Sequence, residues 1–518
     1  MPKDHIKAIH CRNFRGFKQR KIEGLDPGLN IFIGDNDTGK SSILLAIELV
    51  LGANPGRVEA IGLDKLLNQG VVDEFLAKSD RTFADLPEMQ IDLYLNGEGR
   101  EEFDGQHNIA RVEAHGLYLR CRPREELIKE INEIVSKNDI AFPYEYYMVE
   151  IKGFSGETIT PYRKPLACLA IDNTKISSEL ASRAYIKTIY HANTSDTEKH
   201  SLKYAYREAK DLYAKNNFSI INARMEGDYG FSVRNNVKAN LETDLTICRS
   251  GVDIDNLGMG QQCFIRTEFA LAKRTNIDIV LLEEPENHLS HPNMKRLINV
   301  IKDASQSQVF VATHSSLVCS RLDLRHAILF GPIDRDPIKL DALPPSTAEF
   351  FMKAPDSSVL EFALSDRAVL VEGDAEYILM EAFFTAETGN GLSGSGISVI
   401  SIGGISFPRY LDIAKLLGKK VAVITDNDGD PESTCVNRYS VFEGSDNIKV
   451  FYDSDKDRRT FEVCVYRDNQ VLCDGLFSEG RRAKDADGGR IYAQKQVRCR
   501  LRTGLKEGDR DEGPVIHS

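Results

Sequence analysis

A glycine-rich loop near the start of the chain contains residues that could bind phosphate groups and a metal ion. Residues 34–41 read GDNDTGKS, which fits the pattern GxxxxGKS. Glycines let backbone amides turn toward phosphate oxygens, the lysine reaches the terminal phosphates, and the serine hydroxyl can ligate magnesium. The loop therefore predicts binding of ATP or GTP. The expected contacts are Gly34, Asn36, Gly39, Lys40, Ser41 and Ser42, with Ser41 also on the metal.

A second group of candidate residues consists of carboxylates in the last third of the chain. These are Glu372, Glu376, Asp426, Asp428 and Asp430. Carboxylate oxygens suit Mg²⁺, with Mn²⁺ as an alternative, and such ions can activate water and stabilise the leaving oxygen of a phosphodiester. We predict a phosphoryl-transfer centre with Glu372, Asp426 and Asp428 as its catalytic residues. Together with a nucleotide switch, this centre indicates an enzyme that works on nucleic acid.

Paired acids downstream of the loop could complete the nucleotide site. Residues 277–282 read IDIVLL, a buried-strand pattern that ends in Glu283-Glu284-Pro285-Glu286. We assign Glu283 to supporting magnesium through water and Glu284 to polarising the attacking water. A later strand pattern is followed by Thr313-His314-Ser315, where His314 could sense the terminal phosphate.

The elements that must position these residues are short strands followed by helices, which indicates an α/β fold. Because open α/β sheets place their sites at the carboxyl ends of the strands, Glu372 and Asp426 should converge. Alternation along an extended strand would direct Asp426 and Asp428 to the same side. Strands are expected at 29–33, 90–95, 146–151, 277–282, 307–312, 368–371, 397–402 and 421–425, and helices at 42–50 and 377–384.

The chain is too long, at 518 residues, for one ordinary domain. Helical spacing between the two halves of the nucleotide site predicts an inserted helical subdomain used for self-association. A proline-rich stretch without periodicity predicts a linker. The expected parts are an ATPase head over 1–174 and 246–330, the helical insertion over 175–245, a linker over 331–357, a carboxylate domain over 358–475 and an atypical tail over 476–518.

Composition sets further limits. The formal charge of −12 gives no global basic footprint of a nucleic-acid binder, although a local groove of lysine and arginine can hold a phosphate backbone. No stretch approaches the roughly 18 apolar residues that span a bilayer, and the start lacks a signal-peptide pattern. We expect a cytoplasmic protein without a membrane partner, whose ten cysteines are reduced thiols.

Some residues with chemical potential have a plainer interpretation. His288 and His291 lack a further ligand cluster, so a role in turns and helix capping is favoured over metal binding. The basic run 18–21 is interpreted as a solvated strand face rather than a DNA contact.

The order of the nucleotide motifs resembles ATP-binding-cassette (ABC) ATPases of the chromosome-maintenance and recombination-repair type. The motifs are residues 13–17 (NFRGF), the loop, the EEPE run, the THS run and a signature-like run at 257–261. In that family two heads sandwich ATP, which implies at least a homodimer here. Two departures from the family bear on hydrolysis, since Gly258 replaces a serine and Glu283 replaces an aspartate. The resemblance makes Gly258, Gly260 and Gln261 nucleotide contacts.

The carboxylate segment resembles the Toprim domain of topoisomerases, primases and certain nucleases, through VEGxxE at 371–376 and DxD at 426–428. An ABC ATPase with a trailing Toprim domain resembles the overcoming-lysogenisation-defect (OLD) family over residues 1 to about 465. That resemblance implies Mg²⁺-dependent nicking or cutting of DNA, often in defence against phage. It also implies a homodimer or higher homo-oligomer, in some cases with a partner gene product or a retron reverse transcriptase and its ncDNA.

The same resemblance makes Glu462, in Thr460-Phe461-Glu462, a further metal ligand. The tail departs from the family, because residues 479–518 show no helical periodicity where a helix with an assisting lysine is expected. A disordered tail or a change of reading frame near 475 would both explain it. Two rival functions remain open. One is an ATP-controlled repair clamp without cleavage, and the other is a Toprim enzyme that makes or joins strands.

Overall fold

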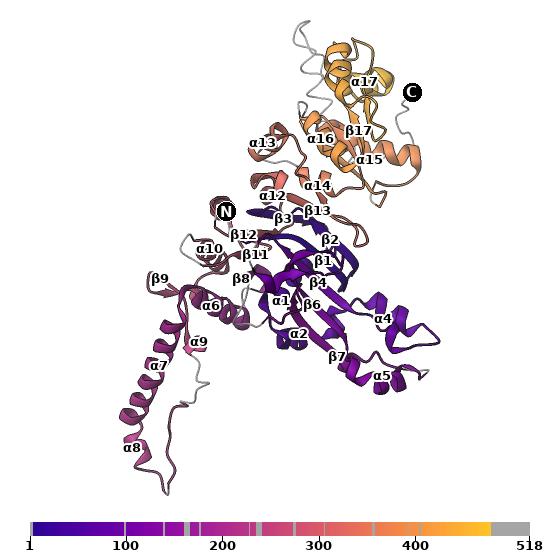
Figure 1. Cartoon of the computed structure of the whole chain (residues 1–518). Helices are drawn as coiled ribbons and strands as arrows, with labels where there is room; N and C mark the ends of the chain where they lie inside the picture. The colour runs from indigo at the N-terminus through magenta and orange to yellow at the C-terminus, as the bar shows by residue number, and fades with distance from the viewer. Residues whose placement is uncertain are drawn as a thin grey trace. The chain divides into compact units, whose positions relative to one another are not determined.

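The computed structural model divides into two compact units, one of Met1–Val318 with His326–Ile338 and one of Cys319–Arg325 with Lys339–Ser518 (Figure 1). The residues it describes are 4–97, 100–137, 140–159, 166–175, 178–226, 228–234, 241–272, 276–304, 306–354, 358–392, 394–403 and 406–477.

An antiparallel sheet forms one part of the first unit. Its strand order is β2-β1-β4-β6-β5, with β7 also paired to β6. The strands predicted at 90–95 and 146–151 are confirmed as β4 and β7. The bounds are β1 Ile6–Phe14, β2 Phe17–Glu23, β4 Met89–Leu95, β5 Asp104–Gly105, β6 Ala114–Pro123 and β7 Tyr147–Gly153.

The second sheet of this unit carries the nucleotide motifs. Its order is β14-β13-β3-β12-β11-β8, and the neighbours from β13 to β8 run parallel. The carboxyl ends of β3, β11, β12 and β8 therefore meet at one edge of the sheet. The bounds are β3 Leu29–Gly34, β8 Cys168–Asp172, β11 Ile279–Glu283, β12 Gln308–Ala312, β13 Ala327–Phe330 and β14 Ile338–Lys339.

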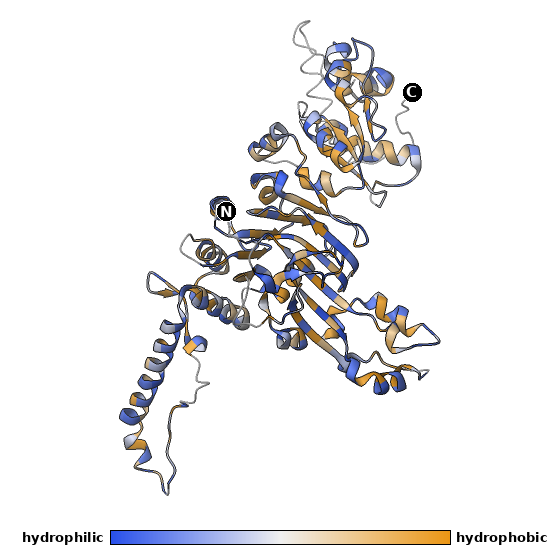
Figure 2. Cartoon of the chain, viewed as in Figure 1, coloured by the Kyte–Doolittle hydropathy of each residue, from blue (hydrophilic) through white to orange (hydrophobic). Residues whose placement is uncertain are grey.

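Helix α1 (Lys40–Gly52) follows β3 directly and joins the two sheets into one core. Its buried face includes Ile43 and Ile47, which share a cluster with Phe32 of β3 and Ile91 of β4. Apolar residues run along the strands of the core in Figure 2. The phosphate loop connects the six-residue strand β3 to this helix. Burial of the helix face therefore also fixes the position of the loop.

The insertion is helical, as the sequence predicts. It contains α6 (Glu179–Asn193), α7 (Asp196–Asn217), α8 (Ser219–Asn222) and α9 (Leu241–Asp244). Helix α7 begins with a capping box in which Ser195 and Glu198 satisfy each other's backbone N–H groups, and none of its residues is buried. Glu242 of α9 accepts hydrogen bonds from Lys187 and Lys203 at 3.0 and 2.9 Å, which ties α9 to α6 and α7.

The second unit has a four-stranded parallel sheet in the order β16-β15-β17-β18. The fold class predicted for this segment is confirmed. Val371 at the end of β15 lies opposite Ser401 and Ile424, so three strands end at the same level. The bounds are β15 Arg367–Val371, β16 Ile397–Ser401, β17 Lys420–Ile424 and β18 Ile448–Phe451, with helices α15 Asp374–Thr388, α16 Phe407–Leu417 and α17 Phe461–Asp468.

The stretch 331–357 is not a structureless linker, so that interpretation is corrected. It contains α13 (Pro345–Lys353), and α14 (Val359–Leu364) follows it. Pro345 occupies the first helical turn, where the missing N–H costs nothing, so Pro344 and Pro345 mark a helix start rather than a break. Phe351 of α13 is fully buried. The tail from 478 onward lies outside the described residues.

Two expectations from composition can be compared with the described segments. No helix in them has both the length and the apolar character to cross a membrane. The cysteines within them are free thiols, and Cys11, Cys121, Cys263, Cys319 and Cys435 are buried.

Arg20 corrects the interpretation of the run 18–21 as a solvated face. Its side chain is fully buried, and its guanidinium donates to the carbonyl oxygens of Arg335 and Thr38. The guanidinium also lies 4.8 Å from the centre of the Phe17 ring. Arg20 thus fastens the phosphate loop, through Thr38, to the segment that follows β13.

Replacing Arg20 with alanine should destabilise the ATPase unit by roughly 3 kcal/mol, because it removes a donor from the carbonyl oxygens of Arg335 and Thr38 and opens a cavity where the buried side chain lay. Calorimetric unfolding should show a lower melting temperature for that unit. The exposed neighbour Gln19, changed to alanine, should shift stability by no more than about 0.5 kcal/mol. Equal melting temperatures for the two variants would contradict the anchoring role.

Candidate nucleotide and metal sites

The phosphate loop is shaped by a glycine that no other residue could replace without strain. Gly39 has φ of 94°, and a Cβ atom there would lie 2.2 Å from Cζ of Phe17. Lys40 is buried, and its Nζ donates to the carbonyl oxygens of Gly34 at 2.9 Å and Asp35 at 2.8 Å. Burial lowers the pKa of Lys40, while Glu284 and other nearby acids raise it. The lysine is therefore held as a directed cation inside the turn.

A cavity of about 800 Å³ opens above this loop. It brings together residues that the sequence predicts from three separate motifs, since the carboxyl ends of β3, β11 and β12 share one edge. The predicted residues that line it are Asn36, Gly39, Lys40, Ser41, Ser42, Glu283, Glu284 and His314. The carbonyl oxygen of Gly34 accepts the hydrogen bond from Lys40 described above.

Glu284 has the properties of a general base. Its backbone has φ of 47°, and its Oε1 lies 3.4 Å from Nε2 of His314. Burial and the nearby Glu286 raise the pKa of Glu284 to about 8, against the opposing effect of Lys40. Glu286 is held in place by the N–H of His314 at 3.1 Å. A carboxylate with a pKa near neutrality can take a proton from water, which suits the role predicted for Glu284.

Three residues beside the loop were not predicted. Arg15 has φ of 48° and donates to Oγ of Ser42 at 3.5 Å, and Thr174 lines the cavity. Asn173 is buried and donates from Nδ2 to the carbonyl oxygen of Glu284 at 3.4 Å, while its Oδ1 has no partner within the described segments. Asn173 and Thr174 follow β8, whose end lies at the same edge as Glu283. The short strand pattern at 168–172 is the signal that could have found them.

The signature-like residues lie elsewhere. Gly258 caps helix α10 (Met259–Ala270), and a Cβ atom on Gly260 would lie 2.3 Å from the carbonyl oxygen of His288. Neither these glycines nor Gln261 lines the cavity of the phosphate loop. Their contact with nucleotide therefore stays a prediction that depends on a second head.

The two histidines near the EEPE run occupy structural positions. His288 has φ of 64° in the turn after that run, and His291 is the first residue of α11 (His291–Lys302). These positions agree with the interpretation as turn and helix-start residues.

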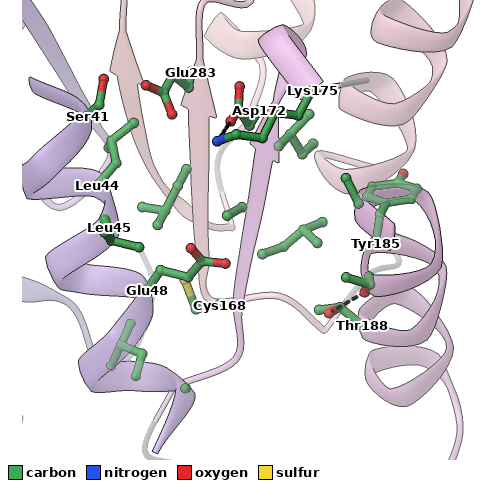
Figure 3. Close-up of a pocket in the computed structure, with 18 of the residues that line it drawn as sticks. Ser41, Leu44, Leu45, Glu48, Cys168, Asp172, Lys175, Tyr185, Thr188 and Glu283 are labelled. Carbon is green, nitrogen blue, oxygen red and sulfur yellow. Dashed lines mark hydrogen bonds and ion pairs between the residues drawn. The ribbon is translucent and has the colours of Figure 1, made fainter. Parts of the chain in front are cut away.

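A second cavity, of about 540 Å³, lies beside the first between α1, β8 and α6. Figure 3 shows Ser41 and Glu283 at its upper end and Glu48, Tyr185 and Thr188 farther along its walls. Because Ser41 and Glu283 line both cavities, the helical insertion borders the nucleotide site through α6.

The carboxylates of the second unit meet where β15 and β17 end. Glu372 follows β15, and its Oε1 accepts hydrogen bonds from Oγ1 of Thr425 at 2.6 Å and from the N–H of Asp426 at 3.0 Å. Glu376 is in the first turn of α15, and its Oε2 accepts the N–H of Gly373 at 3.1 Å. Backbone amides and the hydroxyl of Thr425 position these two acids.

The pKa shifts of these acids reflect burial first and the charges of neighbouring acids second. Burial, together with the nearby Glu372, Glu376 and Glu462, raises the pKa of Asp426 to about 7. Burial also raises the pKa of Glu376, which is only 4% exposed, with smaller effects from Glu462 and Glu372. Glu462 comes from the first turn of α17, whose start is fixed by the N–H of Phe461 donating to Oδ1 of Asp426 at 2.8 Å.

The donor chemistry of this acid cluster, defined as Glu372, Glu376, Asp426 and Glu462, fits Mg²⁺, which prefers carboxylate oxygens. A divalent cation would offset the repulsion that raises the pKa of Asp426. Among the described residues, however, no three His, Cys, Asp or Glu side chains are already gathered at metal-binding separation. Binding would therefore require side-chain movement, with Glu372 giving up part of its hydrogen bonding to Thr425.

The argument that placed Asp426 and Asp428 on the same side by strand alternation is wrong. Strand β17 ends at Ile424, so the extended backbone does not continue to these residues. Asp428 has φ of 48° and is exposed in a turn, and Asp430 is exposed with its Oδ1 accepting the N–H of Ser433 at 3.2 Å. Asp428 nevertheless lies near the cluster, since it and Glu372 both raise the pKa of Cys435.

The nucleotide loop yields a direct test. Changing Gly39 to alanine should abolish ATP binding, because the new Cβ would collide with Phe17 and L residues are strained at φ near 94°. Gly52, at the other end of α1, has no atom within 4 Å of its would-be Cβ. Its alanine variant should bind ATP as the parent does. Calorimetric titration with ATP analogues checks both, and normal binding by the Gly39 variant would refute the assignment.

Comparisons with known proteins agree with this geometry. Residues 5–250 match the model of an AAA ATPase domain, and residues 192–320 match a further AAA domain model named for the AbiEii toxin of a type IV TA system. Residues 364–428 match the overcoming lysogenization defect protein-like TOPRIM domain.

Other relatives share less with this chain. An uncharacterized protein of Methanocaldococcus jannaschii is 47% identical over 51 residues, which cover 10% of this chain and 23% of that protein. The chain thus matches less than a quarter of that relative. A solved SMC head bound to the C-terminal winged-helix domain of ScpA is 16% identical and covers 65% of this chain and 99% of its own, with a TM-score of 0.34. The SMC head of Thermotoga maritima is 13% identical and covers 65% of this chain and 99% of its own, with a TM-score of 0.31.

The two matched domains correspond to the two sites described above. The AAA model contains the phosphate loop, and the Toprim model contains Glu372, Glu376, Asp426 and Asp428. The chain therefore contains an AAA ATPase domain and, towards its C-terminal end, an OLD-like Toprim domain.

Proposed function

We propose that this protein is an ATP-binding, Mg²⁺-dependent DNA endonuclease that nicks or cuts DNA. The observation that supports this most is the convergence of four carboxylates from three separate segments, where burial and the neighbouring acids together raise the pKa of Asp426 to about 7. When bound, Mg²⁺ supplies charge to activate water and to stabilise the leaving oxygen of a phosphodiester. The acid cluster holds it, and Mn²⁺ is expected to substitute.

The ATPase heads, in this proposal, assemble the oligomer and control access to the Toprim site. The loop of one head would face Gly258, Gly260 and Gln261 of another. This arrangement fits the finding that these residues do not line the loop cavity of their own chain. Helix α7 supports self-association, because Leu202, Leu212 and Tyr213 are 45%, 54% and 57% exposed. Exposed apolar residues in this number on one helix favour a covering partner, here another copy of the chain.

The proposal extends to the setting of the enzyme. It is a cytoplasmic homodimer or larger homo-oligomer that acts on DNA in defence against phage. A partner gene product, or a retron reverse transcriptase with its ncDNA, would supply the trigger. The proposed domain boundaries are those expected from the sequence, with the helix α13 now included in the segment 331–357.

One observation favours a second function. The described residues hold no ready three-donor metal group, so the Toprim unit could bind DNA without cutting it. The protein would then be an ATP-controlled DNA-binding repair protein whose Toprim site does not catalyse.

A plasmid assay separates these functions. Supercoiled plasmid incubated with the parent protein and Mg²⁺ or Mn²⁺ should be converted to nicked or linear DNA. Changing Glu372 to glutamine should slow this at least about 100-fold, because it removes charge from the proposed metal site. Glu381, exposed on α15, gives a matched control, and its glutamine variant should cut at the parental rate. The Lys40→Ala variant tests dependence on ATP.

Lack of metal-dependent nicking by the parent, under conditions where it binds DNA, would favour the repair protein. Nicking that survives Glu372→Gln would show that the cluster is not the active site.

Metal binding should depend on pH in a defined direction. Because the pKa of Asp426 is raised to about 7, the metal-free protein carries a proton there below pH 7, and a metal must displace it. Affinity for Mn²⁺ should therefore fall as pH drops from 8 to 6, by up to about tenfold per unit below the pKa for one proton. Calorimetry in buffers of different ionisation enthalpy should detect proton release at pH 7.

The Asp426→Asn variant should release no proton on any residual binding. Equal Mn²⁺ affinity of the parent at pH 6 and pH 8 would contradict the prediction.

A further inference from the structure

Arg459 lies directly over the turn that follows the first aspartate of the DxD motif. Gly429 in that turn has φ of 83°, and a Cβ atom on it would lie 3.3 Å from Nε and 3.6 Å from Cδ of Arg459. The carbonyl oxygen of Arg459 accepts the N–H of Asp428 at 3.2 Å. The arginine side chain therefore extends across the turn between Asp426 and Asp430.

The backbone that carries Arg459 is held firmly on both sides. The buried Asn427 donates from Nδ2 to the carbonyl oxygens of Asp453, Asp455 and Arg458 at 2.6, 2.9 and 3.1 Å. On the other side, Phe461 donates its N–H to Asp426. Because the backbone is held at Arg458 and again at Phe461, Arg459 has little backbone freedom.

The two adjacent arginines differ sharply in how their guanidinium groups are used. Arg458 donates to Asp453 at 2.6 Å and to both carboxylate oxygens of Asp468 at 2.7 and 2.5 Å. Arg459 is exposed, and within the described part of the chain its guanidinium has no hydrogen bond or ion pair. The guanidinium of Arg458 is used in intramolecular ion pairs. The guanidinium of Arg459 is held over the turn, and its N–H groups can donate to a ligand.

The charge around Arg459 indicates what it would bind. The acid cluster places four carboxylates beside the turn, and these acids repel an approaching DNA strand. A guanidinium presents parallel N–H donors that match the two non-bridging oxygens of a phosphate. It is also always charged, so it attracts the DNA backbone at any working pH.

We propose that Arg459 binds a phosphate of the DNA strand beside the acid cluster and so positions the phosphodiester there. This inference rests on the proposed function for its substrate, and it adds a residue that the metal ligands alone do not supply. Arg459 would make one bidentate phosphate contact, which raises affinity without reading sequence.

The experiment compares Arg459→Ala, Arg459→Lys and Lys456→Ala in the full chain. Lys456 is an exposed cation of the same loop and serves as the control for loss of one positive charge. Binding to a short fluorescent DNA duplex is measured in Ca²⁺ over a range of salt concentrations. Mn²⁺ affinity and melting temperature are measured in parallel.

Arg459→Ala should weaken DNA binding about tenfold and lower the slope of log K against log salt by roughly 0.9, the value for one phosphate contact. Arg459→Lys should keep the slope but recover only part of the affinity, because a lysine cannot donate in the same forked geometry. Lys456→Ala should change both quantities less. The Mn²⁺ affinity of Arg459→Ala should match that of the parent.

Unchanged DNA affinity and salt slope for Arg459→Ala would overturn the proposal, as would a loss of affinity explained by a lower melting temperature or weaker Mn²⁺ binding. The nuclease proposal is judged separately. If the parent fails to nick plasmid while Arg459→Ala still loses DNA affinity and slope, the phosphate contact stands and the nuclease claim fails. If the parent nicks plasmid and Arg459→Ala binds DNA as the parent does, the nuclease claim stands and the phosphate contact fails.

Discussion

Parallel strands end at one edge of their sheet, and both candidate sites of this chain depend on that constraint. In the ATPase unit it brings the loop after β3 together with the acids after β11 and the histidine after β12. In the Toprim unit it brings Glu372 after β15 to the backbone that follows β17. Residues separated by hundreds of positions in sequence become neighbours because the strands before them are paired in register.

The Toprim unit shows the energetic consequence of that arrangement. Burial, and after it the charges of the neighbouring carboxylates, disfavour the charged form of Asp426, so this residue holds a proton near neutrality. The metal-free fold should therefore lose stability as pH rises through about 7, because Asp426 ionises against its neighbours. Backbone N–H groups and the loop organised by Asn427 hold the acids together in spite of this repulsion. Such a site is poised for a divalent cation, which removes the repulsion.

Motifs with fixed local geometry could be predicted from the sequence. The phosphate loop, the strands around it and the turn at Glu372 follow from glycines, alternation and apolar runs, so they were placed correctly. Longer-range features were not. Asn173 and Thr174 follow a five-residue strand without a motif, and only pairing with β11 brings Thr174 to the nucleotide cavity and Asn173 to the backbone of Glu284.

Local rules also failed where tertiary contacts override them. Alternation was extended to Asp428 although the strand ends at Ile424 and the backbone turns there. Arg20 was expected in solvent because its neighbours are basic, yet its side chain is buried against the Phe17 ring and donates to two backbone carbonyl oxygens. Arg459 gives no sequence signal at all. Its role depends on which of two adjacent arginines is already engaged by aspartates.

The central claim is that three distant segments share one divalent cation, and cleavage of the chain by bound iron tests it most directly. Fe²⁺ in place of Mg²⁺, with ascorbate and peroxide, cuts the backbone near the metal. The account predicts fragments from cuts close to Glu372, Asp426 and Glu462, suppressed by excess Mg²⁺ and absent in the Glu376→Gln variant. Cuts confined to one segment, or unaffected by that variant, would contradict it.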